Sequence, residues 1–336
     1  MAQRRGGKQA GGRKKATRKA VRKRRTRPKP GDGPVAGRRR SCGCLQAHFG
    51  LLDSYPEFRA NQARIDQFTQ FYLQAGDFVA RRGVTALSVV VHVVHRTGDE
   101  NISDRQVRSQ IDVLNRDFRA KNPDVSEVPA PFRDRVADAR IEFALADRDP
   151  DGNPTSGIER VRTTRRSFRH LDDDVKSSAT GGLEPWDTER YLNLWVCTLA
   201  GGLLGYAQFP GGPPEKDGVV ILNTAFGTTG TAAAPFDGGR TTVHEVGHYL
   251  NLAHIWGERR IPGCGDTDFV DDTPNQFDKN FGSPSFPHIS CNNGPHGDLF
   301  MNYMDYVDDD AMFMFTHDQV KRMHATLSGP RSGLGA

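Results

Sequence analysis

The sequence predicts an α/β domain in which a twisted mixed sheet is backed by two helices and followed by an irregular, loop-rich half. Three observations carry this prediction. The β-branched run 86–95 is typical of a strand, an amphipathic helix follows it, and beyond residue 253 the chain becomes rich in Gly, Asp, Pro and Asn. With 336 residues, of which 36% are apolar, the chain is long enough for one large core or two modest ones.

The first β–α unit is the best defined part of this domain. Residues 86–95 read ALSVVVHVVH, and their high valine content favours a strand. Ser103–Gln106 then form a capping box, which is a signal for the start of a helix. In that helix the apolar residues recur at spacings of 4, 3 and 4, and they form one stripe of Val107, Ile111, Leu114 and Phe118.

Further elements are expected along the rest of the chain. Strands are predicted at 141–146, 191–199 and 219–223, a helix at about 242–253, and a last short helix at 317–327. The strand at 218–222 is either an edge strand against which an extended peptide pairs or a plain core strand.

A basic tail, residues 1–41, precedes the domain. Residues 1–40 hold seventeen Lys and Arg against Asp32 alone, so the tail carries about +16 and the remaining chain about −11. With almost no hydrophobic residue, the tail is expected to be disordered. Its charge would suit nucleic-acid phosphates, but no aromatic residue lies between the charges to stack on bases. No apolar segment follows that would make it a secretory signal.

Between the tail and the domain, residues 56–76 predict one amphipathic helix, because Ile65, Phe68 and Tyr72 fall at helical spacing. Arg81-Arg82-Gly83 then breaks the pattern and is typical of a linker. No stretch of the sequence approaches the roughly 18 to 20 continuous apolar residues that cross a bilayer, so no membrane span is expected.

The residues with the clearest chemistry are His244, Glu245 and His248, which form H-E-x-x-H on the predicted helix. The two imidazoles lie one turn apart on the same face, so both can bind one metal ion. His254 supplies a third ligand if the chain turns after the helix, which leaves one zinc position open for water. Glu245 would take a proton from that water and return it to a leaving amine. A structural zinc site is the alternative, and Glu245 argues against it.

These motifs resemble those of the metzincin proteases, whose pattern is H-E-x-x-H-x-x-G-x-x-H followed by a methionine-containing turn. Asn251 stands at the usual glycine position, and Asn tolerates left-handed backbone geometry well. Residues 302–306, NYMDY, look like the methionine turn, with Met304 beneath the metal and Tyr306 near it. Together with HEVGHYLNLAHIWG, LWVCTLAGGLLGYAQFPG and DTPNQ, they resemble the pappalysin family, including its ulilysin-like microbial members.

The resemblance covers roughly residues 42–323 and implies a domain division. A short helical pro-segment, 42–82, would precede a metzincin-type catalytic domain at 83–336. The implied function is zinc-dependent hydrolysis of internal bonds in proteins or peptides, with Glu245 as base and then acid. Tyr306 would help to stabilise the tetrahedral oxyanion.

The family resemblance also assigns roles to cysteines. Cys42, in the sequence RRSCG, looks like the pro-segment cysteine whose thiolate occupies the open zinc position and keeps the enzyme latent. Cys44 is a competing candidate, and an exposed thiol or a Cys42–Cys44 pairing are the alternatives. Cys264 and Cys291 match the family's disulfide, whereas Ser283 and Ala311 replace a second one. Cys197, in a predicted strand, is expected to be a small buried hydrophobe.

Two acidic loops are candidates for binding cations. Family members bind calcium near the run 266–273, where the oxygen ligands would come from Asp268, Asp272 and Thr273. Asp310 follows the methionine turn where ulilysin-like enzymes place an acid at the base of the pocket for the residue after the scissile bond, which predicts cleavage before Arg or Lys. Each loop could instead be a solvated acidic turn.

The remaining expectations concern processing, location and partners. Arg81–Arg82 is a candidate activation site, which an enzyme preferring Arg could cut itself. The implied disulfide indicates an oxidising, extracellular compartment, and we expect a monomer. The competing function is a nucleic-acid-associated protein in which the basic tail binds and the zinc is structural.

Overall fold

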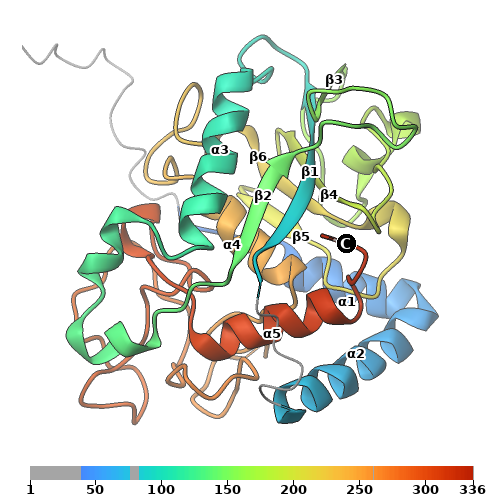
Figure 1. Cartoon of the computed structure of the whole chain (residues 1–336). Helices are drawn as coiled ribbons and strands as arrows, with labels where there is room; N and C mark the ends of the chain where they lie inside the picture. Colours follow the sequence, from blue (N-terminus) through green and yellow to red (C-terminus); the bar gives the residue numbers. More distant parts are fainter. Residues whose placement is uncertain (1–38, 76–82, 260, 336) are drawn as a thin grey trace, which may run out of the picture. The chain divides into compact units, whose positions relative to one another are not determined.

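The computed structural model describes residues 39–75, 83–259 and 261–335 (Figure 1). The expected basic tail lies outside the described residues except for Arg39–Ser41, and the candidate activation site Arg81–Arg82 lies outside them altogether. The disorder of the tail and the site of activation therefore stay predictions.

The described part of the chain contains five α-helices and six strands. The helices are α1 (Cys44–Ser54), α2 (Pro56–Ala75), α3 (Asp104–Asp117), α4 (Arg240–Tyr249) and α5 (His317–Ser328). The strands are β1 (Thr85–His95), β2 (Ile141–Leu145), β3 (Ile158–Arg162), β4 (Tyr191–Cys197), β5 (Gly205–Ala207) and β6 (Val219–Leu222). Short 3-10 turns occupy Pro123–Glu127, Ala130–Arg135, Asp174–Lys176, Ser178–Thr180, Pro214–Lys216, Asn223–Ala225 and Asp309–Ala311.

The strands form one mixed sheet in the order β2-β1-β4-β6-β5, so the predicted α/β architecture is confirmed. All neighbours are parallel except β5, which runs antiparallel to β6. The long strand β1 pairs with β2 over its first half and with β3 over its second half. Its residues 89–94 are all buried, as expected of a valine run in the centre of a parallel sheet.

Helices α3 and α4 pack against each other (Figure 1). Helix α3 also packs on β2, and α4 packs on β5 and β6. The predicted cap of α3 is confirmed, because the Ser103 hydroxyl accepts from the Gln106 amide at 3.2 Å. The buried face of α3 is more polar than its apolar stripe indicates. Gln106 and Gln110 are buried there and donate to the carbonyls of Phe226 and Gly239, each at 2.9 Å, which ties α3 to the segment that leads into α4.

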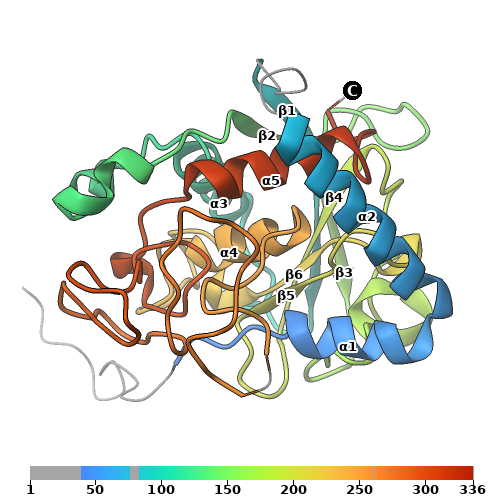
Figure 2. The same cartoon turned by 90° about the horizontal axis from the view of Figure 1, so that it is seen from below.

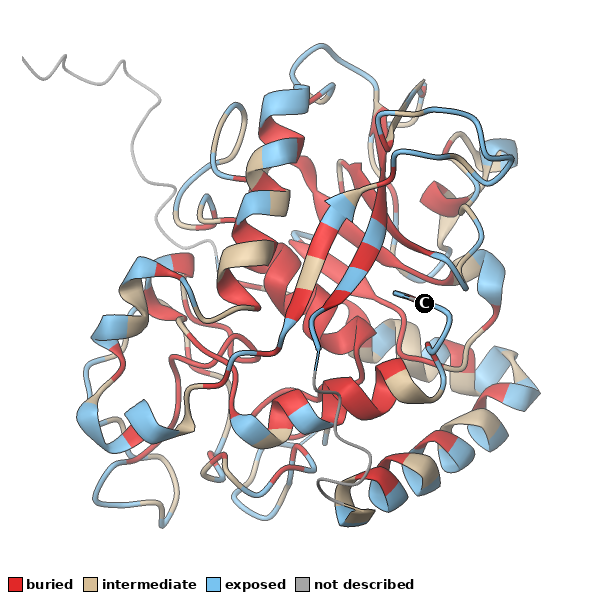
Figure 3. Ribbon diagram, viewed as in Figure 1, coloured by how far each residue is buried: buried red, intermediate tan, exposed pale blue. Residues whose placement is uncertain are grey.

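The predicted pro-segment contributes two helices (Figure 2). Helix α1, which the sequence did not predict, packs against β5, and α2 packs against α5. The expected amphipathic pattern of α2 is confirmed at Ile65 and Tyr72, which are buried, whereas the opposite face is exposed (Figure 3). Phe68 is half-buried and lies against Gly329, where a Cβ would come within 2.4 Å of its ring.

The chain between α4 and α5 is irregular, as predicted, and a disulfide joins Cys264 to Cys291. A buried carboxylate, Asp305, organises part of this region by accepting from the side chain of Gln276 at 2.9 Å and from the main chain of Asn280 at 2.8 Å. Cys197 is fully buried in β4, as expected. No described helix is both long and apolar enough to span a bilayer.

Candidate active site

Helix α4 places the first two predicted ligands on one buried face. It begins after Gly239, whose φ of 75° is left-handed, and it ends at Tyr249, four residues before the predicted end. The early end has a local cause, because Asn251 adopts the left-handed region with a φ of 72°. This confirms that Asn takes the turning role of glycine here. The turn then brings His254 back towards His248.

The three imidazoles converge through one nitrogen each. The Nε2 atom of His248 lies 3.1 Å from Nε2 of both His244 and His254, and all three rings are buried. Nitrogens bound at about 2.0–2.1 Å to one tetrahedral zinc ion would be about 3.3 Å apart. The observed spacing is therefore close to that of a zinc triad.

The other nitrogen of each ring faces an acceptor. Nδ1 of His244 donates to the Tyr303 carbonyl at 2.7 Å, and Nδ1 of His248 to the Leu252 carbonyl at 2.8 Å. Because a neutral imidazole with its proton on Nδ1 has a lone pair on Nε2, the lone pairs of these rings point at one another. Burial lowers the pKa of His244 to about 3, which keeps that ring neutral. Such a cluster of lone pairs fits a bound cation.

His254 has a different partner, Glu258. The Glu258 carboxylate lies 3.2 Å from Nδ1 of His254 and accepts from its main-chain N–H at 2.9 Å. Although burial alone would lower it, this neighbouring charge raises the pKa of His254 to about 9. The sequence motifs do not identify Glu258, although its place four residues after the third histidine is a detectable signal.

Two sulfur atoms from the predicted pro-segment approach the same centre. The Sγ of Cys42 lies with the three histidine nitrogens in a group whose atoms are all within 4.8 Å of one another. Burial alone would raise the pKa of the Cys42 thiol, but a hydrogen bond from Cys44 and the neighbouring histidines hold that pKa well below its ordinary value. Cys42 and the histidines thus offer one sulfur and three nitrogens to a tetrahedral ion.

Cys44 faces the carboxylate of Glu245 instead. Its Sγ lies 2.9 Å from Oε2 of Glu245 and also accepts from the Ala207 amide at 3.0 Å. Cys42 Sγ is 3.3 Å from the same carboxylate oxygen. Burial raises the pKa of Glu245 above its ordinary value, and Cys42 adds to this shift. In this state both thiols shield the predicted catalytic base from solvent.

The predicted methionine turn lies directly beneath α4. Met304 is fully buried, and a Cβ on Gly247 would come within 2.5 Å of its sulfur. Any side chain at position 247 would therefore have to displace the Met304 thioether from its place against α4. An amide pair between Asn302 and Gln319 joins the turn to α5 at 2.8 and 3.0 Å.

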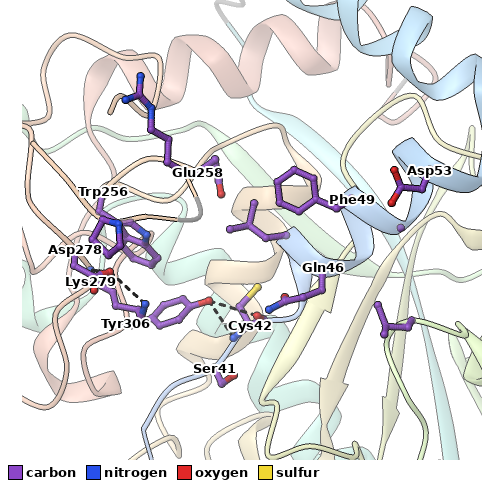
Figure 4. Close-up of a pocket in the computed structure, with 15 residues that line it drawn as sticks. Ser41, Cys42, Gln46, Phe49, Asp53, Trp256, Glu258, Asp278, Lys279 and Tyr306 are labelled. Atoms are coloured by element: carbon purple, nitrogen blue, oxygen red, sulfur yellow. Dashed lines mark hydrogen bonds and ion pairs between the residues drawn. The ribbon is translucent and has the colours of Figure 1, made fainter. Parts of the chain in front are cut away.

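Tyr306 stands beside the histidines and holds the main chain of Cys42. Its hydroxyl accepts from the Cys42 amide at 3.1 Å (Figure 4). Its ring lies edge-on to His254, with the centroids 5.2 Å apart. Burial and the charges of nearby thiols and carboxylates raise the pKa of Tyr306, so its proton is retained. Beside these residues a cavity of about 660 Å³ opens between α1 and the loop half.

The edge strand beside this centre is β5, and not the segment 218–222 as one sequence alternative had it. That segment forms β6, which is paired on both sides and is a plain core strand. The predicted pro-segment pairs with the edge of β5 that faces away from β6. The Gly43 amide donates to the Gly205 carbonyl, and the Leu204 amide donates to the Ser41 carbonyl, each at 2.9 Å. Cys42 pairs with Gly205 in parallel.

Arg40 fills a buried pocket next to the centre. It donates to Asp309 Oδ1 at 2.5 Å, to the Val307 carbonyl at 2.9 Å and to the Thr241 hydroxyl at 3.1 Å. The second oxygen of Asp309 accepts from the amide of Gly238 at 2.8 Å. The sequence placed Arg40 in a disordered tail, but its guanidinium is buried and each of its three nitrogens donates a hydrogen bond.

Asp310, the predicted pocket acid, does not face this arginine. Asp310 is exposed and accepts from the hydroxyl of Ser283 at 3.0 Å. The buried carboxylate in contact with a basic side chain is its neighbour Asp309. Asp309 is therefore a second candidate for the pocket acid, and the role of Asp310 stays a prediction.

In the candidate calcium loop, the structure brings Asp268 and Thr273 together. Both oxygens of the buried Asp268 carboxylate accept from the Thr273 hydroxyl, at 2.9 and 2.8 Å. Burial raises the pKa of Asp268 to about 7. The carboxylate oxygens of Asp272 accept from the Thr316 hydroxyl at 2.7 Å and from the Asp318 amide at 2.9 Å at the start of α5, and its role as a third ligand stays a prediction.

Known proteins share these features. Residues 172–328 match the family described as "Pregnancy-associated plasma protein-A". An extracellular metalloprotease of Pyricularia oryzae is 30% identical over 272 residues, which cover 77% of this chain and 80% of the relative. A second extracellular metalloprotease, from Arthroderma gypseum, is 30% identical over 243 residues, which cover 70% of this chain and 70% of the relative.

Solved structures of mirolysin from Tannerella forsythia are similar to this one. A promirolysin mutant superimposes with a TM-score of 0.81 at 43% identity and covers 88% of this chain and 97% of its own. Mature mirolysin in complex with a cleaved peptide gives a TM-score of 0.74 at 48% identity and covers 76% of this chain and 97% of its own. The converging histidines and these similarities together establish that the chain belongs to the pappalysin family of metzincin zinc metalloproteases.

Proposed function

We propose that the protein is made as a latent zinc endopeptidase that hydrolyses internal peptide bonds before basic residues. The observation that carries this proposal is the convergence of three histidine Nε2 atoms beside Glu245, with a pro-segment thiol at the fourth position. Cleavage of a mixed peptide library by the processed protein, lost with a zinc chelator and restored by zinc, tests it. Undiminished cleavage of the library by the metal-free protein would refute it.

His244, His248 and His254 would hold the ion, and each residue around them has a separate task. Bound there, zinc polarises the scissile carbonyl and lowers the pKa of a water molecule. Glu245 takes the proton of that water and returns it to the leaving amine. Once the pro-segment has left, the Tyr306 hydroxyl is free to donate to the developing oxyanion instead of binding the Cys42 main chain.

Latency would come from two thiols that block two different catalytic groups. The Cys42 thiolate would take the place of water at the metal. Cys44 covers Glu245, so it acts on the base and need not be a metal ligand. The larger coverage of this chain by promirolysin than by mature mirolysin, 88% against 76%, supports assigning the first described residues to a pro-segment.

Removal of this pro-segment would need a cut between α2 and β1. Helix α2 ends at Ala75 and β1 begins at Thr85, and Arg81–Arg82 lies between them. A cut there separates the proposed pro-segment, 42–82, from the proposed catalytic domain, 83–336. N-terminal sequencing of the processed form checks this position.

The Arg40 pocket supports a preference for a basic residue after the scissile bond. Arg40 lies two residues from Cys42, so its guanidinium marks a pocket close to the metal position. The pocket supplies a carboxylate, a carbonyl and a hydroxyl to one arginine, and the Phe236 ring lies 5.1 Å from the guanidinium carbon. In the processed enzyme a substrate Arg or Lys would take the place of Arg40.

Asp309→Asn is expected to weaken this preference. Loss of one partner from a buried, hydrogen-bonded charge pair costs at least about 2 kcal/mol, or about 30-fold in kcat/KM for an Arg substrate. The library assay measures the ratio of cleavage before Arg to cleavage before Leu. Asp310→Asn is the matched control and is expected to leave that ratio unchanged. The opposite result would move the pocket acid back to Asp310.

We also propose a calcium ion at Asp268 and Thr273, because a buried carboxylate that has no basic partner within ion-pair distance among the described residues favours a bound cation. Calcium at 100 times its dissociation constant would add about 2.7 kcal/mol to the free energy of unfolding. We expect a calcium-selective chelator to lower the Tm, calcium but not zinc to restore it, and Asp268→Asn to abolish the effect. A Tm that does not respond to calcium would contradict this site.

The protein would be secreted and act as a monomer on protein or peptide substrates. The names of the two fungal relatives, both extracellular metalloproteases, and the Cys264–Cys291 disulfide support secretion. Light scattering of the purified chain checks the monomeric state.

A further inference from the structure

Glu258 is built into a tight turn directly after the third histidine. Gly257 in this turn has a φ of 89°, and a Cβ there would come within 2.2 Å of the Asp266 carboxylate carbon. Asp266 also accepts from the amide of Arg259 at 2.7 Å. The turn thus leaves no room for a side chain at position 257, and a hydrogen bond holds the residue that follows Glu258.

The turn directs both Glu258 oxygens at the same residue. Oε1 accepts from the main-chain N–H of His254 at 2.9 Å, and Oε2 lies 3.2 Å from Nδ1 of its ring. On the ring face, Trp256 stacks against His254 with centroids 4.4 Å apart and planes 18° from parallel. The stacked indole and the carboxylate thus determine the plane of the imidazole and the nitrogen that carries its proton.

His254 differs in this respect from the other two histidines. The Nδ1 atoms of His244 and His248 donate to main-chain carbonyls, which are neutral. Nδ1 of His254 is the one that faces a carboxylate. Moreover, His254 is the histidine that α4 does not carry, because it follows the turn at Asn251. The ligand with the least support from a helix therefore has the strongest hydrogen-bond acceptor.

We propose that Glu258 is a positioning residue of the zinc site. Its carboxylate keeps the His254 proton on Nδ1, which turns the Nε2 lone pair towards the metal, and its negative charge makes that nitrogen a stronger donor to zinc. Acceptors behind ligating histidines act in this way in many metal sites, where their loss typically weakens metal binding 10- to 100-fold. The inference rests on the proposed function, in which His254 is the third zinc ligand.

Glu258 also lines the cleft that contains Trp256 and Tyr306 (Figure 4), so direct contact with substrate is the competing role. The two roles differ in what they change. A positioning residue changes the affinity for zinc in the absence of any substrate. A substrate contact changes KM and leaves the affinity for zinc as it was.

The test measures zinc affinity of the full-length chain by competition with a chromophoric chelator, and the visible spectrum of the cobalt-substituted chain. Glu258→Ala is expected to bind zinc 10- to 100-fold more weakly and to shift the cobalt bands, because the His254 donor changes. Glu258→Gln should fall between Glu258→Ala and the wild type, since an amide oxygen accepts from Nδ1 without a charge.

Two controls separate this inference from the proposed function. Glu159→Ala removes a matched carboxylate, 2.8 Å from Nδ1 of the buried His92 in the sheet, and should leave zinc affinity unchanged. His254→Ala should lose far more affinity than Glu258→Ala; if it binds zinc like the wild type, the proposed ligand set is wrong. If His254→Ala fails to bind but Glu258→Ala binds within about twofold of the wild type, or changes KM alone, only the role of Glu258 is overturned.

Discussion

Glu245→Gln is expected to lower kcat/KM of the processed enzyme by about 10² to 10⁴-fold, because the amide cannot take a proton from water or return one to the leaving amine. The substitution keeps the size of the side chain, and the proposed zinc ligands are the three converging histidines, not Glu245. The zinc content should therefore stay at the wild-type level. The mixed peptide library and metal analysis of the same sample provide both measurements.

The control for this substitution is Glu184→Gln, in which an exposed glutamate bound to Ser178 is changed in the same way. It should hydrolyse peptides like the wild type. A Glu245→Gln enzyme with activity within tenfold of the wild type would mean that another group acts as the base. Loss of zinc from that variant would instead mean that Glu245 supports the metal site.

Cys42→Ala is expected to abolish latency. In the intact chain the Cys42 sulfur lies with the three histidine nitrogens, so its removal opens the fourth metal position to water. The variant precursor should hydrolyse peptides or process itself under conditions in which the wild-type precursor does neither. Peptide cleavage and gel analysis of the same incubation measure both. A variant precursor that stays intact and inactive would contradict the role of Cys42.

Two further variants sharpen this result. Cys197→Ala removes a buried thiol from β4, away from the metal position, and should preserve latency. Cys44→Ala uncovers Glu245 but leaves Cys42 at the metal position, so its precursor should stay latent. If Cys44→Ala releases activity and Cys42→Ala does not, the two thiols have exchanged roles.

The zinc cassette could be predicted from the sequence because its geometry is local. His244 and His248 are one helical turn apart on α4, and Asn251 adopts the left-handed conformation that its type permits. Met304 could be predicted from the family motif alone. Its sulfur packs against Gly247, which lies inside the zinc motif itself. Local backbone preferences and short motifs carry this part of the site.

The rest of the site depends on contacts between distant parts of the chain. Strand β5 has three residues, Gly205–Ala207, and no pattern of its own. It is a strand because it pairs with β6. The burial of Arg40 depends on Asp309, 269 residues later, so composition alone placed that arginine in the tail.

The surroundings of the acidic residues depend on tertiary packing in the same way. Asp309 and Asp310 are adjacent and identical in type, and only the path of the turn decides which one is buried. Asp272 belongs to an acidic run, but its carboxylate is used at the start of α5, where Thr316 and Asp318 bind it. A sequence motif identifies an acidic loop, whereas tertiary packing decides which carboxylate is free.

The most direct test of this account is X-ray absorption at the zinc edge of the full-length precursor and of its processed form. We expect one sulfur at about 2.3 Å and three imidazole nitrogens at about 2.0–2.1 Å in the precursor, with the sulfur replaced by a light atom after processing. A precursor whose zinc has no sulfur ligand, or a processed form that retains one, would contradict it.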